Sequence, residues 1–322
     1  MDEELDPAIL AALPEGCVTA VNPHGKGSWS SGYKVDVEAN GEEHKFFLKI
    51  IRRPRYAEMA LGEYESQKEL QKYLPDNVIV PTAQGQCQLD SSASFFLARF
   101  RDLDEKVAQP SQLVEVLERL HRLSTSPNGK FGFHVATFNG WAPLVNEWCD
   151  TWEEYFTRQS RSDIAWMSSI RGPDAEFDVV VKEFFDKVVP RLLRPLQTGA
   201  EISSRRWCMA MCGLGIYRST WPSSGLFSLI HAAAMGITSL GWPVDLAMMR
   251  EPRYQFTSEH VNKYKEVVGP SEPVEDFDDR NALYAMAFLK DKVKEEMMRL
   301  IAKHPYGIDG FVEHLHVSEH GD

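Results

Sequence analysis

Near the start of the chain apolar and polar positions alternate with the period of two that is typical of β-strands, as Tyr33, Val35 and Val37 show. Residues 43–51 are predicted to form the returning strand. Between the two segments stands Asn40-Gly41, a dipeptide that favours the two-residue turn of a β-hairpin. The pattern therefore predicts an antiparallel hairpin near the start of the chain.

Other segments of this region have their own signals. Good helix formers predict a helix over residues 57–73, and a shorter helix is expected at residues 6–13. Apolar runs predict the remaining strands at residues 17–22, 78–81 and 94–99.

From residue 112 onward the apolar spacing becomes helical. A stripe runs along the first helix and consists of Leu113, Val116, Leu117, Leu120 and Leu123. His121 lies beside this stripe, and its spacing predicts a packed core histidine rather than a catalyst. Further helices are expected at residues 174–196, with a kink at Pro190, and at residues 258–267 and 280–302.

Residues 203–249 follow neither period. Between Trp207 and Met249 only Arg218 and Asp245 carry charge, although 25% of the whole chain is charged. Five of the eleven methionines lie here, and prolines and glycines interrupt the segment. We expect it to lack the regular strand–loop–strand arrangement of a catalytic centre.

Composition excludes several classes of protein. A hydrophobic fraction of 43% excludes a disordered chain, and a net charge of −12 argues against binding to nucleic acid or to an anionic membrane. The acidic N-terminus carries no secretory signal pattern. The most apolar run, residues 225–237, is too short to cross a bilayer.

Five cysteines without a CxxC pair indicate reduced thiols in a cytoplasmic protein. The spacing of Cys208, Cys212 and His231 matches no common zinc pattern, so no metal site is assigned to them.

Two features of the N-terminal strands suggest phosphate chemistry. Gly25 and Gly27, followed by Ser28, form a glycine- and serine-rich turn ahead of the hairpin, and Lys49 lies among apolar residues on the returning strand. Taken alone, Lys49 is better explained as a charge at a sheet edge that prevents pairing with another strand. The glycines taken alone are better explained as an ordinary loop. A glycine turn, a hairpin and a strand lysine in this order favour a nucleotide-binding site.

Such a site also needs a glutamate on the following helix to hold the lysine. The helix predicted at residues 57–73 offers four, namely Glu58, Glu63, Glu65 and Glu69. Most of them must be solvated surface charges.

One long stretch resembles a known family. It contains Lys130-Phe-Gly-Phe-His134, Asn139-Gly140, Asn146-Glu-Trp148 and Trp152-Glu-Glu-Tyr-Phe156. This pattern is similar to the fructosamine/ribulosamine 3-kinase (ketosamine 3-kinase) family. The turn His24-Gly25-x-Gly27-Ser28-Trp29 and the strand Phe47-Leu-Lys-Ile50 most resemble its fungal-type members. The resemblance covers roughly residues 16–202 and 252–306.

The resemblance implies an α+β, two-lobed protein-kinase-like fold. Residues 1–100 would form the N-lobe with a small antiparallel sheet, and residues 101–322 a larger, mainly helical C-lobe. The implied activity is the phosphorylation of the sugar 3-hydroxyl of ketosamines, on glycated proteins or as small molecules, with ATP and Mg²⁺.

The resemblance also assigns roles to residues. Lys49 would bind the nucleotide phosphates, Glu63 would position Lys49, and the turn with Gly25, Gly27 and Ser28 would cover the phosphates. Ala98, Arg99 and Phe100 would form the hinge that reads adenine through its backbone. Relatives often carry an acidic residue where this chain has Arg99, a change that a backbone contact should tolerate.

Two family motifs are absent from the chain. A loop of the form Val-His-Gly-Asp-x-Trp-x-x-Asn should supply the base and a metal ligand, and a later Phe-Asp-Pro/Ser motif the metal-binding acid. Both belong where residues 203–249 stand, so no catalytic residue and no metal ligand can be identified. Asp276, Asp278 and Asp279 follow the expected metal site and are interpreted as a helix N-terminus.

A shifted reading frame accounts for the loss. Reading the codons of Trp207 to Ile216 from the third base of the tryptophan codon permits Val-His-Gly-Asp-Val-Trp-Ser-Gly-Asn. The same offset permits Phe-Val-Asp-Pro-Cys from Phe227 and Tyr-Gly-His-Asn-Glu from Ala234 to Ser239. Both missing motifs are therefore compatible with one shifted frame, and the chain as printed is expected to be impaired.

Three alternatives remain at this stage. The segment can be a splice variant or a genuine insert, which would make the chain a nucleotide-binding pseudokinase without activity. An aminoglycoside- or choline-type phosphotransferase would share the fold, but it leaves the motif between Phe131 and Phe156 without explanation.

Overall fold

The computed structural model describes residues 5–26, 30–52, 54–102, 108–139, 142–197, 206–208, 235–238, 246–247, 250, 256–286 and 292–311. These residues form two compact units. The first holds the chain up to Ala108 together with Val135–Leu144, and the second holds Gln109–His134 and the described residues from Val145 onward.

The first unit is built on the predicted hairpin. Asn40 and Gly41 have φ angles of 54° and 78°, the left-handed conformation that a tight hairpin turn requires. They join β2 (Ser30–Ala39) to β3 (Glu42–Ile51), and Ala39 lies opposite Glu42. The register places Gly32 opposite Lys49, near the far end of the ladder.

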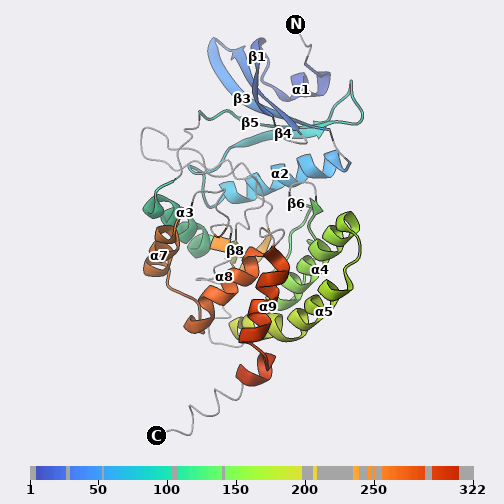
Figure 1. Ribbon diagram of the computed structural model, residues 1–322. Coiled ribbons are helices and arrows are strands. Elements are labelled where there is room, and N and C mark those ends of the chain that lie inside the picture. The colour runs from blue at the N-terminus through green and yellow to red at the C-terminus, as the bar shows by residue number, and fades with distance from the viewer. Residues whose placement is uncertain are drawn as a thin grey trace. The chain divides into compact units, whose positions relative to one another are not determined.

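Three more strands complete an antiparallel sheet of order β1-β2-β3-β5-β4 (Figure 1). β1 spans Cys17–Lys26, β4 spans Pro81–Gln86, and β5 spans Ser94–Arg99. The prediction for β5 is confirmed, whereas the strand expected at residues 78–81 is wrong, because the chain becomes a strand only at Pro81. A proline that starts an edge strand is compatible with pairing, since its missing N–H faces away from the ladder.

The two faces of the sheet bury different helices. Phe46, Leu48 and Ile50 pack in one apolar cluster with Ile9 of α1 (Pro7–Ala12). The alternate positions of β3 face α2 (Tyr56–Gln71), where Ile51 packs against Met59 and Ala60. Strand β3 is therefore covered on both faces, which explains how a charged residue within it becomes buried.

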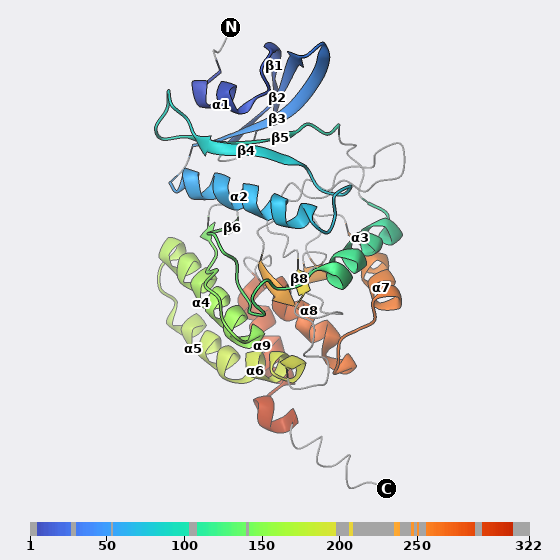
Figure 2. The same cartoon turned by 180° about the vertical axis from the view of Figure 1, so that it is seen from behind.

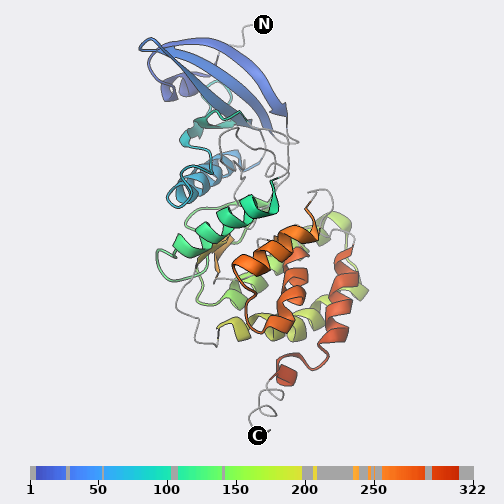
Figure 3. The same cartoon turned by 90° about the vertical axis from the view of Figure 1, so that its left-hand side faces the viewer.

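The second unit is mainly helical. Its first helix, α3 (Pro110–Leu123), packs beside α7 (Ser258–Val267), as Figure 3 shows in green and orange. Four of the five predicted stripe residues of α3 are buried, but Leu123 at the end of the helix is 42% exposed. His121 is buried as predicted, and its Nδ1 lies 3.1 Å from the hydroxyl of Tyr264.

Two long helices expected from the sequence are divided in the structure. Residues 175–193 form α5 (Ala175–Glu183), a π-helical turn (Phe184–Val188) and α6 (Val189–Leu193), followed by a 3₁₀ turn (Pro195–Gln197). The π-helical turn precedes Pro190, which has no N–H for the helical ladder, so the irregularity lies where the kink was predicted. The helix expected at residues 280–302 is instead α8 (Phe277–Ala285) and α9 (Val293–Lys303).

The remaining elements include the long helix α4 (Trp152–Arg171), the short strands β6 (Phe138–Asn139) and β7 (Ala142–Pro143), and a 3₁₀ turn at Val274–Asp276. No helix among the described ranges is long and apolar enough to span a bilayer. The described cysteines Cys17, Cys87 and Cys149 are free thiols, and burial raises the pKa of Cys87 and of Cys149 to about 11.

Trp152 at the start of α4 should dominate the stability of the second unit. Its side chain is 1% exposed, and its Nε1 donates a hydrogen bond of 3.0 Å to the hydroxyl of Tyr284. Trp152→Ala should lower the free energy of unfolding by about 3–5 kcal/mol, because it leaves a large cavity and removes a buried hydrogen bond. Urea unfolding followed by far-UV circular dichroism measures this. Val179→Ala, at a position 67% exposed, should change little, and equal losses in both variants would contradict the assignment.

Asp163 on α4 should make stability depend on pH. Burial raises the pKa of Asp163 from 3.8 to about 6, against a hydrogen bond of 2.8 Å from Gln159 that lowers it. A folded-state pKa above the unfolded value means that the protonated form stabilises the fold, and that this contribution is lost as pH rises from 3.8 through 6. Asp163→Asn should therefore be more stable than the parent at pH 7, by on the order of 2 kcal/mol, and equal to it near pH 4. A stability difference that does not vary with pH would contradict this.

Candidate functional site

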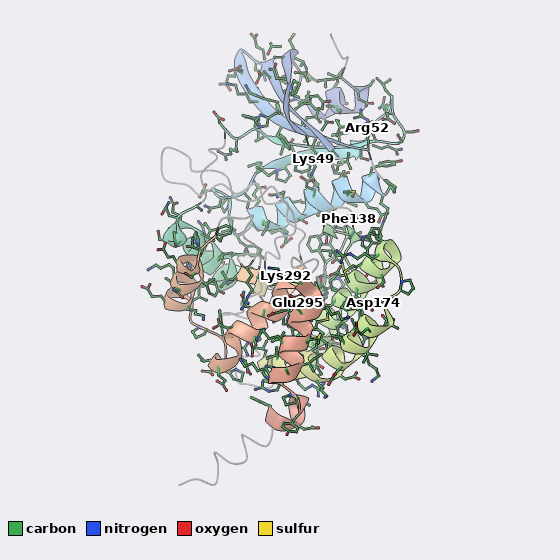
Figure 4. The ribbon with its side chains drawn as sticks, viewed as in Figure 1. Lys49, Arg52, Phe138, Asp174, Lys292 and Glu295 are labelled. Atoms are coloured by element: carbon green, nitrogen blue, oxygen red, sulfur yellow. The ribbon has the colours of Figure 1, made fainter. Side chains whose placement is uncertain are left out.

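The centre of the candidate site is a buried ion pair in the first unit. Lys49 Nζ donates a hydrogen bond of 2.6 Å to Glu63 Oε2, and the two side chains are 6% and 10% exposed. β3 supplies the lysine and α2 supplies the glutamate. The expected contact between Glu63 and Lys49, which Figure 4 labels above α2, is therefore confirmed.

The glycine-rich turn lies over the strand that flanks Lys49. A Cβ on Gly32 would lie 2.4 Å from the carbonyl oxygen of His24 and 3.3 Å from that of Gly25, so only glycine permits this approach. Gly25 has a φ angle of 86°, and a Cβ there would meet nothing within 4 Å. Gly27 and Ser28, the other predicted turn residues, lie outside the described residues.

The predicted hinge residues lie at the end of β5: Ala98 and Arg99 are its last two residues, and Phe100 follows it. Ala98 is buried, and Arg99 is exposed with its guanidinium 5.0 Å from the ring of Phe46. The backbone N–H of Arg99 donates to the carbonyl of Val80, and that of Phe100 donates to the carbonyl of Lys45, both at 2.9 Å. These two N–H groups are already used within the sheet, so a base could be read here through carbonyl oxygens or through later residues.

The ring of His24 lies beside the predicted hinge, at a position to which the family resemblance assigns no role. The ring of His24 makes edge contacts with Phe100, at a centroid distance of 4.9 Å, and with Phe47, at 6.2 Å. Lys34 Nζ lies 5.5 Å from the ring of Phe100. The only sequence signal for His24 was its position immediately before Gly25.

The segment expected to lack regular pairing is described at only a few positions. Within residues 203–249, β8 (Arg206–Cys208) and β9 (Met235–Thr238) pair antiparallel, with Trp207 opposite Ile237. These residues therefore pair as strands, whereas the expected lack of a catalytic centre's strand–loop–strand arrangement over the whole segment stays a prediction. The rest of the segment, apart from residues 246–247, lies outside the described residues.

One cluster in the second unit has the composition of a metal site. Asp276, Asp279 and His304 have ligand atoms within 4.8 Å of one another, the one such group found in the described part of the chain. Asp279 Oδ2 lies 2.7 Å from Lys303 Nζ and 3.0 Å from His304 Nε2. Burial alone would raise the pKa of Asp279, but hydrogen bonds from His304 and Lys303 hold it well below its usual range.

Asp276 is also paired with a cationic side chain, because the guanidinium of Arg191 donates hydrogen bonds to both of its carboxylate oxygens. Cationic side chains thus neutralise these carboxylates, and a divalent cation would have to displace them. The cluster as described is an ion-pair network between helices.

Comparison with known proteins identifies the family. The family model described as fructosamine kinase matches residues 15–192, more than half of the chain. The chain belongs to the fructosamine kinase family.

Solved structures extend the likeness in fold. A candidate fructosamine-3-kinase from Thermobifida fusca YX-ER1 is 15% identical, with a TM-score of 0.68, over 92% of this chain and 98% of that one. A second candidate, from Haemophilus somnus 129PT, is 16% identical, with a TM-score of 0.62, over 89% and 92% of the two chains. The aminoglycoside phosphotransferase APH(4)-Ia, solved with ADP and hygromycin B, has a TM-score of 0.54 at 14% identity, over 88% and 93%. The fold is that of two-lobed, kinase-like phosphotransferases.

The buried pair makes a testable prediction about stability. Glu63→Gln should lower the free energy of unfolding by about 3–5 kcal/mol, because it removes the carboxylate that lies 2.6 Å from the buried Lys49 ammonium group. The double variant Lys49→Met with Glu63→Leu should recover most of this loss, since it removes both charges. Chemical denaturation of all three proteins measures the effect.

A second lysine–glutamate pair on α2 provides a matched control. Lys72 and Glu69 pair at the surface, where Lys72 is 57% exposed. Lys72→Gln should cost at most about 1 kcal/mol. If it costs as much as Glu63→Gln, burial of the Lys49 pair is not the source of the effect.

Proposed function

We propose that this fructosamine kinase family member descends from an ATP-dependent ketosamine 3-kinase of the cytoplasm. The substrates would be fructosamine or ribulosamine adducts, on the lysines of glycated proteins or on small amines, and the activity would serve deglycation. The observation that carries the proposal is the buried Lys49–Glu63 pair. A kinase uses such a lysine to bind nucleotide phosphates and such a glutamate to orient it.

The other groups of the first unit suit the same ligand. The turn that contains Gly25, Gly27 and Ser28 would cover the phosphates with backbone N–H groups, which bind anions well. Ala98, Arg99 and Phe100 would lie beside the base, with the carbonyl of Arg99 as an acceptor for an exocyclic amine. The rings of His24 and Phe47 would add apolar surface to the base site.

The chemistry requires groups that this chain does not offer. Phosphoryl transfer breaks the bond between the γ-phosphorus and the bridging oxygen to the β-phosphate, and forms a bond to the sugar 3-oxygen. The hydroxyl proton must pass to a base, and Mg²⁺ normally neutralises the phosphate charge. The catalytic-loop aspartate and the metal-binding aspartate are absent from the sequence, and the cluster at Asp279 is neutralised by cations, so Mg²⁺ does not fit the described residues.

We therefore propose that the printed chain binds nucleotide and transfers little or no phosphate. Lys49→Met should weaken the binding of ATP about tenfold or more, because one charge-assisted contact to phosphate is lost. Isothermal titration calorimetry measures the affinity. Lys72→Gln on the surface of α2 should bind like the parent, and an unchanged affinity in Lys49→Met would contradict the assigned role.

The activity test compares two proteins on glycated lysine with ATP, with and without Mg²⁺. The printed chain should stay at background, whereas a chain rebuilt in the shifted frame over residues 203–250 should phosphorylate the ketosamine, and Lys49→Met in the rebuilt chain should abolish this. Equal activity of the printed and rebuilt chains would overturn the account of the segment. Activity of the rebuilt chain on aminoglycosides or choline alone would favour the other phosphotransferase class. Genomic and transcript sequence over residues 202–250 separates a frame error from a genuine insert.

A further inference from the structure

The chain between α3 and α4 returns to the first unit as a small hairpin. Residues 135–144 belong to this unit, and β6 pairs with β7 so that Phe138 lies opposite Pro143. Leu144 N–H donates a hydrogen bond of 2.8 Å to the carbonyl of Thr137, which closes the base of the hairpin. Figure 2 shows β6 alongside α2.

The hairpin and α2 touch backbone to backbone at one point. A Cβ on Gly62 would lie 2.4 Å from the carbonyl oxygen of Ala136 and 3.4 Å from the Cα of Thr137. Real Cβ atoms essentially never approach another atom within 3.0 Å, so a side chain would force α2 and the hairpin apart by at least 0.6 Å, the difference between 3.0 and 2.4. Gly62 immediately precedes Glu63.

A second contact holds the preceding turn of the helix. Phe138, which Figure 4 labels below α2, packs against Ile51, Met59 and Ala60, and the guanidinium of Arg55 lies 5.0 Å from its ring. Met59 and Ala60 stand four and three positions before Glu63, a spacing that places all three on one side of a helix. The hairpin thus contacts α2 at Gly62 and one turn earlier, in both cases just before Glu63 in the sequence.

We infer that the hairpin at residues 135–144 is a positioning element for the Lys49–Glu63 pair. A bond of 2.6 Å between buried charges tolerates little displacement of the helix that carries one of them. Gly62 lets α2 rest against the hairpin backbone at the depth at which Glu63 reaches Lys49. This gives residues 136–138 of the family-like stretch a role in the nucleotide half of the molecule. The inference rests on the proposed function only for its consequence, the binding of nucleotide.

Gly62→Ala tests the inference against helix propensity. Alanine alone would stabilise the middle of a helix relative to glycine. We expect the opposite, a melting temperature about 3–6 °C lower, because the new methyl group displaces α2. In the background Lys49→Met with Glu63→Leu, where no charges have to be aligned, the loss should shrink to less than half.

A merely packing role would give a different result. If Gly62→Ala lowers the melting temperature equally in both backgrounds, the hairpin does not position the pair and the inference is overturned. Lys68→Ala, on the exposed side of α2, is the matched control and should lower the melting temperature equally little in both backgrounds. Should Gly62→Ala fail to fold, Phe138→Leu replaces it in the same comparison.

Nucleotide affinity gives the second readout. Gly62→Ala should weaken ATP binding about tenfold in the parent, and should add nothing in the Glu63→Gln background, because the group that it displaces is then already lost. Additive losses in the two variants would overturn the inference. If the parent binds no ATP at all, the proposed function fails, and the melting comparison still decides whether the hairpin positions the pair.

Discussion

A lysine ammonium group can lie inside a protein only when acceptors and an opposite charge lie against it, because the loss of hydration otherwise costs several kcal/mol. Lys49 meets this condition through Glu63, and the requirement constrains its surroundings. β3 must have neighbours on both edges and helices on both faces to bury the lysine. The helix α2 must then lie at one depth, and Gly32 and Gly62 each permit a backbone approach that a larger residue would prevent.

The second unit uses the same kind of interaction for a different purpose. Asp276 and Asp279 are nearly buried, and each is surrounded by cationic side chains from other helices. There the acidic and basic side chains pair with one another and hold helices together. In a phosphate-binding site, by contrast, a basic side chain must remain able to bind the phosphate. Buried carboxylates in the two units therefore have different chemical roles. The role of each carboxylate depends on the charged side chains around it and not on whether it belongs to an aspartate or a glutamate.

Residues 203–249 separate the part of the chain that matches the family model from the C-terminal helices. The family match ends at residue 192, before this segment, while the likeness in fold to the Thermobifida fusca structure covers 92% of the chain. The groups that would hold a nucleotide precede the segment, and the groups that would accept the proton and bind the metal should lie within it. The proposed function therefore places the groups that bind nucleotide before the segment and the missing catalytic groups within it.

The sequence by itself determined the features that depend on neighbours along the chain. The hairpin at Asn40-Gly41 follows from left-handed turn chemistry, the burial of His121 from helical spacing, and the irregularity before Pro190 from a missing N–H. The family-like motif and the glycine–lysine order also pointed to the fold. Residues 78–81 and 280–302 were assigned wrongly, because strand and helix ends depend on packing against distant segments.

Only the tertiary structure decided which distant groups meet. It selected Glu63 from four similar glutamates, since the choice depends on the rotation and depth of α2 relative to the sheet. It placed Ala136 against Gly62, a contact between segments more than 70 residues apart, where 136 minus 62 is 74. It also showed that the Arg99 and Phe100 N–H groups are used within the sheet. Local patterns carry no information on such contacts, because they arise from the packing of separate elements rather than from periodicity within one.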